Sequence, residues 1–86
     1  EVEQVLLNVK GVLEAAVISV PDSIRGHVVK AFVVVMQGIS VDIPNLMDAC
    51  RQCLEPVQVP REIEIVDSLP RTSNGKVDKG ALLQFV

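Results

Sequence analysis

The chain has 86 residues, enough for one small domain. Hydrophobic residues make up 49% and charged residues 22%, a globular composition that excludes a disordered tail. The net charge is −3 and aromatic residues reach only 2%, so the chain lacks the positive charge and the stacking rings that nucleic-acid binding requires. The apolar runs are too short to span a membrane, and we expect no signal peptide at this N-terminus. The composition indicates a small soluble domain, and its abundant valine favours strands.

The N-terminal half predicts one helix and two strands. Apolar residues at helical spacing predict an amphipathic helix of about two turns, at Val2, Val5, Leu6 and Val9. Gly11 suits the left-handed residue that ends such a helix. The apolar runs at 15–20 and 28–36 predict two adjacent antiparallel strands, the first ended by the turn signal Pro21-Asp22.

The C-terminal half predicts a second helix, a third strand and a short closing helix. The clearest helical stripe comprises Ile43, Leu46, Met47, Cys50, Cys53 and Leu54. Asp42 or Ser40 can cap this helix. Residues 62–65 alternate at period two, as a half-exposed strand does, and Asp78 can cap a helix that runs to Leu83. The fold class is therefore α+β: a small three-stranded, mainly antiparallel sheet flanked by helices, in the order α-β-β-α-β-loop-α.

The two cysteines have the C-x-x-C spacing of a metal half-site or a redox pair. A zinc site needs four ligands, and His27 is the one further candidate of the usual kind. Helical spacing places Cys50 and Cys53 on the face that carries core residues. We therefore expect two buried thiols in a reducing compartment and no metal site.

Residues 69–78, Leu-Pro-Arg-Thr-Ser-Asn-Gly-Lys-Val-Asp, differ in character from the rest of the chain. Together with Lys79 they carry a local charge of +2, whereas the remainder carries −5. A glycine-containing loop that presents a lysine can deliver a mobile cation to a phosphate or carboxylate. The segment is not a Walker A loop, because Pro70 and Val77 stand where that pattern requires glycine and serine or threonine. The alternative is an Asn74-Gly75 hairpin turn beside which Lys76 is merely solvated.

Residues 69–76 resemble the last signature motif of the adenylate-forming (AMP-binding) enzymes, which include acyl-CoA synthetases, peptide-synthetase adenylation domains and luciferases. Further matches cover nearly the whole chain in order, at residues 1–3, 11–17, 20–22, 25–26, 28–34, 59–61 and 63–69. The 28–34 segment resembles the version common among carboxylic acid:CoA ligases. Val57-Gln58 and His27 depart from the usual family residues at positions that carry no chemistry.

The resemblance implies that residues 1–86 are the C-terminal (lid) domain of a carboxylic acid:CoA ligase, without its large N-terminal ATP- and acyl-binding domain. Members activate a carboxylic acid with ATP, and many pass the acyl group to coenzyme A. Lys76 matches the catalytic lysine, which offsets charge at the carboxylate and the α-phosphate. Pro70, Arg71, Thr72 and Gly75 match the residues that shape its loop.

The resemblance also implies ATP, Mg²⁺ and coenzyme A as ligands of the intact enzyme, with none bound by this chain alone. The expected partners are the large domain and a carboxylic acid of the fatty-acid type, and the expected location is cytoplasmic. Because the sequence begins inside a helical pattern, we expect that it was cut from a longer chain. We expect the chain to be inactive alone, because one lysine cannot bind ATP and orient an acid. The alternatives are part of a peptide-synthetase adenylation domain, or a free-standing, non-catalytic binding module of the same fold.

Overall fold

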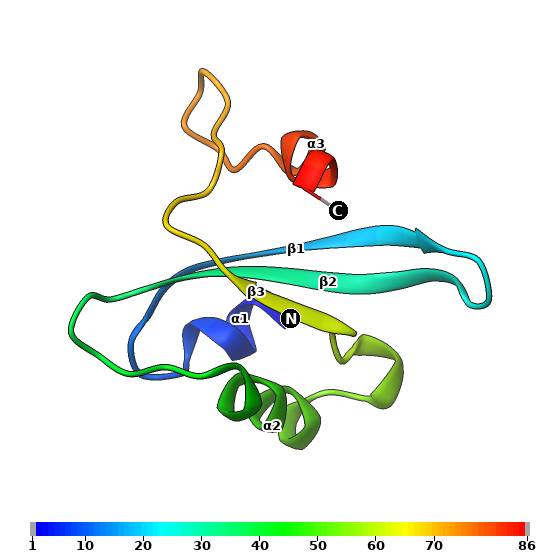
Figure 1. Cartoon of the computed structure of the whole chain (residues 1–86), viewed down its shortest axis with the longest axis horizontal. Coiled ribbons are helices and arrows are strands. Elements are labelled where there is room, and N and C mark those ends of the chain that lie inside the picture. The colour runs from blue at the N-terminus through cyan, green and yellow to red at the C-terminus, as the bar shows by residue number, and fades with distance from the viewer. Residues whose placement is uncertain (1, 86) are drawn as a thin grey trace.

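A computed structural model describes residues 2–85, except for the side chain of Phe85, and shows one three-stranded sheet (Figure 1). Its strands lie in the order β1 (Val12–Asp22), β2 (Gly26–Val35) and β3 (Glu62–Ile65). β1 and β2 pair antiparallel along most of their length, whereas the short β3 pairs parallel to β2. The predicted α+β class and the mainly antiparallel sheet are confirmed.

The helices cover both faces of the sheet. α1 (Val2–Leu7) and α2 (Ile43–Cys53) lie on one face, and α3 (Lys79–Leu82) lies on the other (Figure 1). The segment containing α2 and a 3₁₀ turn at Pro56–Gln58 forms the crossover that parallel pairing of β2 and β3 requires. A second 3₁₀ turn, Leu83–Phe85, follows α3. None of the helices within residues 2–85 is long and apolar enough to cross a membrane.

Two aspartates begin the helices of the C-terminal half. The Asp42 carboxylate accepts a hydrogen bond from the backbone N–H of Asn45 at 2.9 Å, so Asp42 is the cap of α2. The Asp78 carboxylate accepts from the N–H of Ala81 at 3.1 Å and caps α3. Each cap satisfies a backbone donor that a helix start leaves without a partner. Of the two candidate caps for α2, Asp42 and Ser40, the structure has Asp42, and the predicted cap Asp78 is confirmed.

The central strand β2 separates two hydrophobic cores. The core on the α1 and α2 side contains Leu6, Ala31, Val33, Leu46, Cys50 and Ile63. The core on the α3 side contains Ala16, Ile18, Phe32, Val34, Leu69 and Leu82. Successive residues of a strand point to opposite faces, so the continuous apolar run of β2 supplies both cores. The segment that follows β3 is therefore held to the sheet through Leu69 and Leu82.

The prediction that Pro21-Asp22 ends the first strand is wrong. β1 begins at Val12, earlier than expected, and continues through Asp22. It is an edge strand, where a proline that lacks its N–H is tolerated. The turn lies beyond it, where the Asp22 carboxylate accepts hydrogen bonds from the N–H groups of Ile24 (3.2 Å) and Arg25 (2.7 Å).

The prediction of two buried thiols is also wrong, since Cys50 is buried but Cys53 is exposed. Leu46 and Cys50, four residues apart, define the buried line of α2. Cys53 lies at the margin of that stripe, in the last turn of the helix. The i, i+3 spacing alone does not distinguish the centre of an apolar stripe from its edge.

Candidate functional site

Residues 70–78 form a small hairpin, here called the lysine hairpin, which projects from the sheet on the side of α3 (Figure 1). The backbone N–H of Thr72 donates to the carbonyl oxygen of Lys76 at 2.8 Å. The N–H of Asp78 donates to the carbonyl oxygen of Pro70, also at 2.8 Å. These two bonds join the arm that leads into the turn (residues 70–72) to the arm that leads out of it (residues 76–78). The turn between the arms therefore has a defined structure.

The turn has three residues, Ser73, Asn74 and Gly75. The N–H of Gly75 donates to the carbonyl oxygen of Thr72 at 2.9 Å, and Gly75 has φ +85°. No non-glycine residue in the described part of the chain has positive φ, whereas a two-residue Asn-Gly turn requires it at Asn74. The alternative of a hairpin turn at Asn74-Gly75 thus agrees with the structure in forming a hairpin, but the turn has three residues and not two. The glycine takes the left-handed position immediately before Lys76, as in hairpins whose turn is followed by a bulge.

The side chain of Lys76 is exposed, and within residues 2–85 its ammonium group makes no ion pair or hydrogen bond. Lys30 behaves differently: it is buried, and its ammonium lies 3.7 Å from a carboxylate oxygen of Glu62 and 3.2 Å from one of Glu64. The charge of Lys30 is thus neutralised within the domain by the two glutamates. The charge of Lys76 remains available to an anion from outside this chain.

Arg71, predicted as a loop-shaping residue, connects the lysine hairpin to the sheet. Its Nη1 donates to the carbonyl oxygen of Gly75 at 3.0 Å. Its Nη2 pairs with the carboxylate of Glu14 on β1. The structure thus brings the predicted residues Pro70, Arg71, Thr72, Gly75 and Lys76 into one hairpin.

An ion pair lies next to the base of the hairpin. Nζ of Lys79 in α3 lies 2.8 Å from Oε2 of Glu3 in α1, and the backbone N–H of Val17 donates to the same oxygen at 2.9 Å. Partial burial raises the pKa of Glu3, but the bonds from Lys79 and Val17 outweigh it and lower that pKa below its ordinary value. The ionised carboxylate therefore links α1, β1 and α3.

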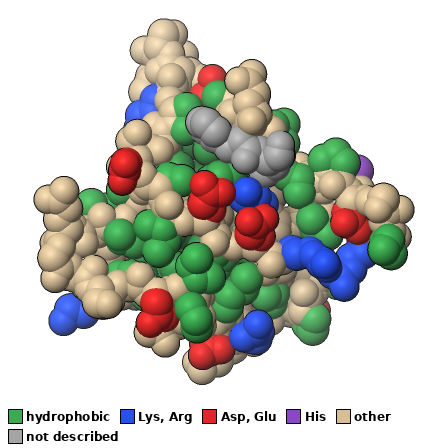
Figure 2. Space-filling model, viewed as in Figure 1, with side chains coloured by type: hydrophobic (Ala, Val, Ile, Leu, Met, Phe, Trp, Pro, Cys, Tyr) green, Lys and Arg blue, Asp and Glu red, His purple; other side chains and the backbone are tan. Residues whose placement is uncertain are grey.

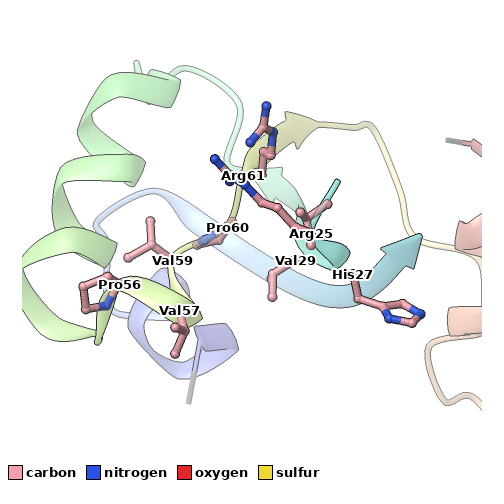
Figure 3. Close-up of a pocket in the computed structure, with 9 residues that line it drawn as sticks. Arg25, His27, Val29, Pro56, Val57, Val59, Pro60 and Arg61 are labelled. Carbon is pink, nitrogen blue, oxygen red and sulfur yellow. The ribbon is translucent and has the colours of Figure 1, made fainter. Parts of the chain in front are cut away.

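A second feature, which sequence reasoning missed, is a groove of about 750 Å³ near the N-terminal ends of β2 and β3. Arg25, His27 and Arg61 line it together with apolar residues such as Val29 and Val57. In Figure 3 the side chains of Arg25 and Arg61 extend on the same side of the groove. In Figure 2 a group of blue Lys and Arg side chains lies on the same side of the molecule as the purple histidine, with a red acidic side chain between them. The groove combines positive charge with an apolar wall.

The tertiary structure brings the two arginines together. Parallel pairing places Glu62, the first residue of β3, opposite Lys30 in the middle of β2, and the N–H of Arg61 donates to the carbonyl oxygen of Val29 at 2.8 Å. The residues just before β3 therefore lie beside the first residues of β2, which follow Arg25. Asp22 lies nearby, and the N–H of Arg25, with smaller contributions from the charges of Arg61 and Arg25, lowers its pKa. The signal in the sequence was only that Arg25-Gly26 and residues 59–61 lay within the matched segments.

The described residues contain no metal centre of the usual composition. Among residues 2–85, no three side chains of the types His, Cys, Asp or Glu lie close enough to hold a metal ion. Both features carry cationic side chains: the exposed ammonium of Lys76 on the lysine hairpin, and the guanidinium groups of Arg25 and Arg61 in the groove.

Comparison with known proteins identifies the family. Residues 1–76 match the model of the AMP-binding enzyme C-terminal domain, and the chain belongs to this family. It is thus a C-terminal domain of the adenylate-forming acyl-CoA synthetase and ligase group, as the sequence motifs predicted.

Individual relatives agree with this assignment. The chain is 45% identical over 85 residues to a substituted octahydroindenyl-propanoyl:CoA ligase of Mycobacterium tuberculosis, covering 99% of this chain and 17% of the relative. It is 40% identical over 84 residues to the long-chain-fatty-acid–CoA ligase of Bacillus subtilis, covering 98% and 15%. The solved amide bond synthetase McbA of Marinactinospora thermotolerans is 40% identical, with a TM-score of 0.92, and the match covers 98% of this chain and 17% of McbA. The chain therefore spans about a sixth of the length of the relatives it matches.

Proposed function

We propose that this chain is the mobile C-terminal domain of an ATP-dependent carboxylic acid:CoA ligase, and that Lys76 acts in acyl-adenylate formation. The observation that carries the proposal is the exposed ammonium of Lys76, without a partner within residues 2–85, on a hairpin that projects from the sheet. A cation that has no ion pair within its own domain and lies on a projecting hairpin can enter a site formed by another domain and leave it again.

The proposed reaction explains why a lysine is needed there. A substrate carboxylate oxygen attacks the α-phosphorus of ATP, a new P–O bond forms, and pyrophosphate leaves. Negative charge on the carboxylate and the phosphate oxygens must be brought together, and the Lys76 ammonium offsets it. A cation that acts mainly in the transition state raises the rate constant rather than only the affinity. Withdrawal of the hairpin by domain rotation would then clear the site for thioester formation.

The groove with Arg25 and Arg61 supports coenzyme A as the acceptor. Coenzyme A carries several phosphate groups, and guanidinium groups bind phosphate with two parallel hydrogen bonds. The apolar wall formed by residues such as Val57 and Val29 offers a surface for the uncharged parts of such a ligand. In this proposal the lysine hairpin serves adenylation and the arginine groove serves the second half-reaction.

Several parts of the reaction fall outside this chain. We assign ATP binding, Mg²⁺ and the acyl pocket to a large N-terminal domain, as the small covered share of the relatives suggests. We expect the isolated chain to be inactive, because one lysine cannot bind ATP and orient an acid. Acid-dependent pyrophosphate exchange catalysed by the isolated chain would contradict this expectation. A cytoplasmic location and a fatty or similar acid as substrate remain parts of the proposal.

The test uses the full-length enzyme that contains this chain, with the substitutions Lys76→Ala and Lys76→Arg. Pyrophosphate release is measured with a panel of carboxylic acids from acetate to long-chain fatty acids. We expect Lys76→Ala to reduce adenylation by about two to three orders of magnitude. Lys10→Ala is the matched control, because Lys10 is also exposed but lies far along the chain from the hairpin. Normal adenylation by the Lys76→Ala enzyme would refute the proposal.

The acceptor is tested separately, since one relative at 40% identity is named an amide bond synthetase. Preformed acyl-adenylate is supplied with either coenzyme A or a simple amine. We expect product with coenzyme A, and we expect Lys76→Ala to leave this step unchanged. Amide formation without thioester formation would instead favour the chemistry named for that relative.

A further inference from the structure

We propose that Glu14 is a positioning residue for the lysine hairpin: through Arg71 it fixes the orientation in which the hairpin presents Lys76. The inference deepens the proposed function and rests on it, since it takes Lys76 to act in adenylation. It assigns to a residue of β1, far from the hairpin in sequence, an influence on that step through Arg71.

A bulge in β1 sets the side of the sheet on which Glu14 stands. The register of β1 against β2 shifts between Val12 and Glu14. Val12 and Ala15 pack with the core under α1 and α2, whereas Ala16 packs with the opposite core. Strict alternation would place Val12 and Ala16 on the same face, so the extra residue reverses the pattern. Glu14 consequently stands on the face of Ala16, which is the side of the lysine hairpin.

Arg71 carries the influence of Glu14 to the turn. One guanidinium nitrogen pairs with the Glu14 carboxylate, and the other donates to the carbonyl oxygen of Gly75 at 3.0 Å. The rigid, planar guanidinium fixes the direction of the second bond once the first is made. Gly75 immediately precedes Lys76, so the anchored carbonyl belongs to the peptide group that leads into the lysine.

Backbone hydrogen bonds hold the two arms of the hairpin to each other, but few contacts hold the hairpin to the sheet. Leu69 and Val77 pack against the core at its base, but residues 72–76 are all exposed. Among the side-chain contacts within residues 2–85, the Glu14–Arg71 pair is the ion pair that joins the sheet to this arm. Removal of the Glu14 charge should therefore leave the fold intact while the tip samples more orientations.

The size of the effect follows from the exposure of the pair. The side chains of Arg71 and Glu14 are 44% and 36% exposed, so the pair contributes modestly and is screened by salt. We expect Glu14→Gln to slow adenylation about two- to fivefold. The Michaelis constants for ATP and the acid should not change, because the large domain binds both before the lysine acts.

The experiment measures both half-reactions in the full-length enzyme. The variants are Glu14→Gln, the conservative Glu14→Asp, and Asp67→Asn as a control that removes the same charge from an exposed residue without an ion pair in the described chain. We expect adenylation to be slowest in Glu14→Gln, at least partly restored in Glu14→Asp, and unchanged in Asp67→Asn. Thioester formation from supplied acyl-adenylate should be normal in all three variants. High salt should slow the native enzyme toward the rate of Glu14→Gln.

Three results would overturn the inference: an unchanged adenylation rate in Glu14→Gln, an equal loss in both half-reactions, or an equal loss in Asp67→Asn. The enzyme with Lys76→Ala, measured in parallel, separates this inference from the proposed function. Normal adenylation by Lys76→Ala refutes the proposed function and the inference together. Slow adenylation by Lys76→Ala with a normal rate in Glu14→Gln refutes the role of Glu14 alone.

Discussion

Nζ of Lys79 lies 2.8 Å from Oε2 of Glu3, so one ion pair joins α3 to α1. The same carboxylate oxygen accepts the N–H of Val17, a backbone donor of the edge strand β1. Edge strands leave such donors unpaired unless a side chain satisfies them. Glu3 therefore serves two structural purposes with one charge, and the stability of the domain should depend on that charge.

Acid should weaken the domain through Glu3. Its pKa in the folded chain is lowered from the ordinary value of 4.5, so its contribution to stability is fully present above that pH and is lost as the pH falls through the folded pKa. In Glu3→Gln the amide oxygen can still accept from Val17, but the charge is gone. At neutral pH we expect the variant to be less stable by about 0.5–1 kcal/mol, as for a half-exposed ion pair.

The measurement is the free energy of unfolding in urea, at neutral pH and at a pH well below 4.5. The native chain should lose more stability between the two conditions than Glu3→Gln does. The control Asp67→Asn removes an exposed carboxylate that has no ion pair within the described residues. Equal losses in the native chain and Glu3→Gln would show that the Glu3 charge contributes nothing.

Gly75→Ala should cost stability through the backbone alone. Gly75 has φ +85°, and an added Cβ would meet no atom within 4 Å. A left-handed backbone costs a residue with a side chain about 1–2 kcal/mol, so we expect a loss of that order or a reshaped turn with slower adenylation. Gly80→Ala is the matched control, because its Cβ would make an ordinary contact at 3.4 Å and alanine favours a helix. If the two variants behave alike, the turn conformation does not matter.

Substitution of the groove arginines should weaken the binding of coenzyme A and leave the reaction with ATP unchanged. Arg25→Ala and Arg61→Ala each remove a guanidinium group from the groove. In the full-length enzyme we expect the Michaelis constant for coenzyme A to rise about tenfold per substitution, as for loss of a charged hydrogen bond. The adenylation rate should stay unchanged, and Lys10→Ala serves as the charge-matched control. An unchanged constant for coenzyme A in both variants would assign that ligand to a different surface.

The two thiols should react at different rates. Cys53 is exposed, whereas Cys50 is buried, and burial, with a smaller contribution from the neighbouring Cys53 thiol, raises the pKa of Cys50. A thiol-reactive disulfide reagent should modify one thiol of the native chain quickly and both in concentrated guanidinium chloride. Cys53→Ser should remove the fast phase and Cys50→Ser should preserve it. Two fast thiols in the native chain would contradict this assignment.

Local sequence signals predicted the elements well but not all of their limits. The caps Asp42 and Asp78 were predicted because capping depends on a side chain and the N–H three residues later. The end of β1 was misplaced at Pro21 because tolerance of proline depends on whether a strand is at an edge, which is a property of the sheet. Cys53 was misplaced for a similar reason, since its exposure depends on what lies opposite the margin of α2.

The candidate site was likewise predicted in part from the sequence and in part visible only in the tertiary structure. The sequence by itself determined the α+β order, the family and the segment that presents Lys76, because periodicity, caps and contiguous motifs are local properties of the chain. Only the tertiary structure decided that Arg61 lies near Arg25 and that Glu14 meets Arg71. Both proximities depend on strand direction and register. The parallel pairing of β3 with β2 brings Arg61 near Arg25, and the shift of register in β1 allows Glu14 to meet Arg71. No local pattern encodes such pairings, because each results from the packing of segments that are distant in sequence.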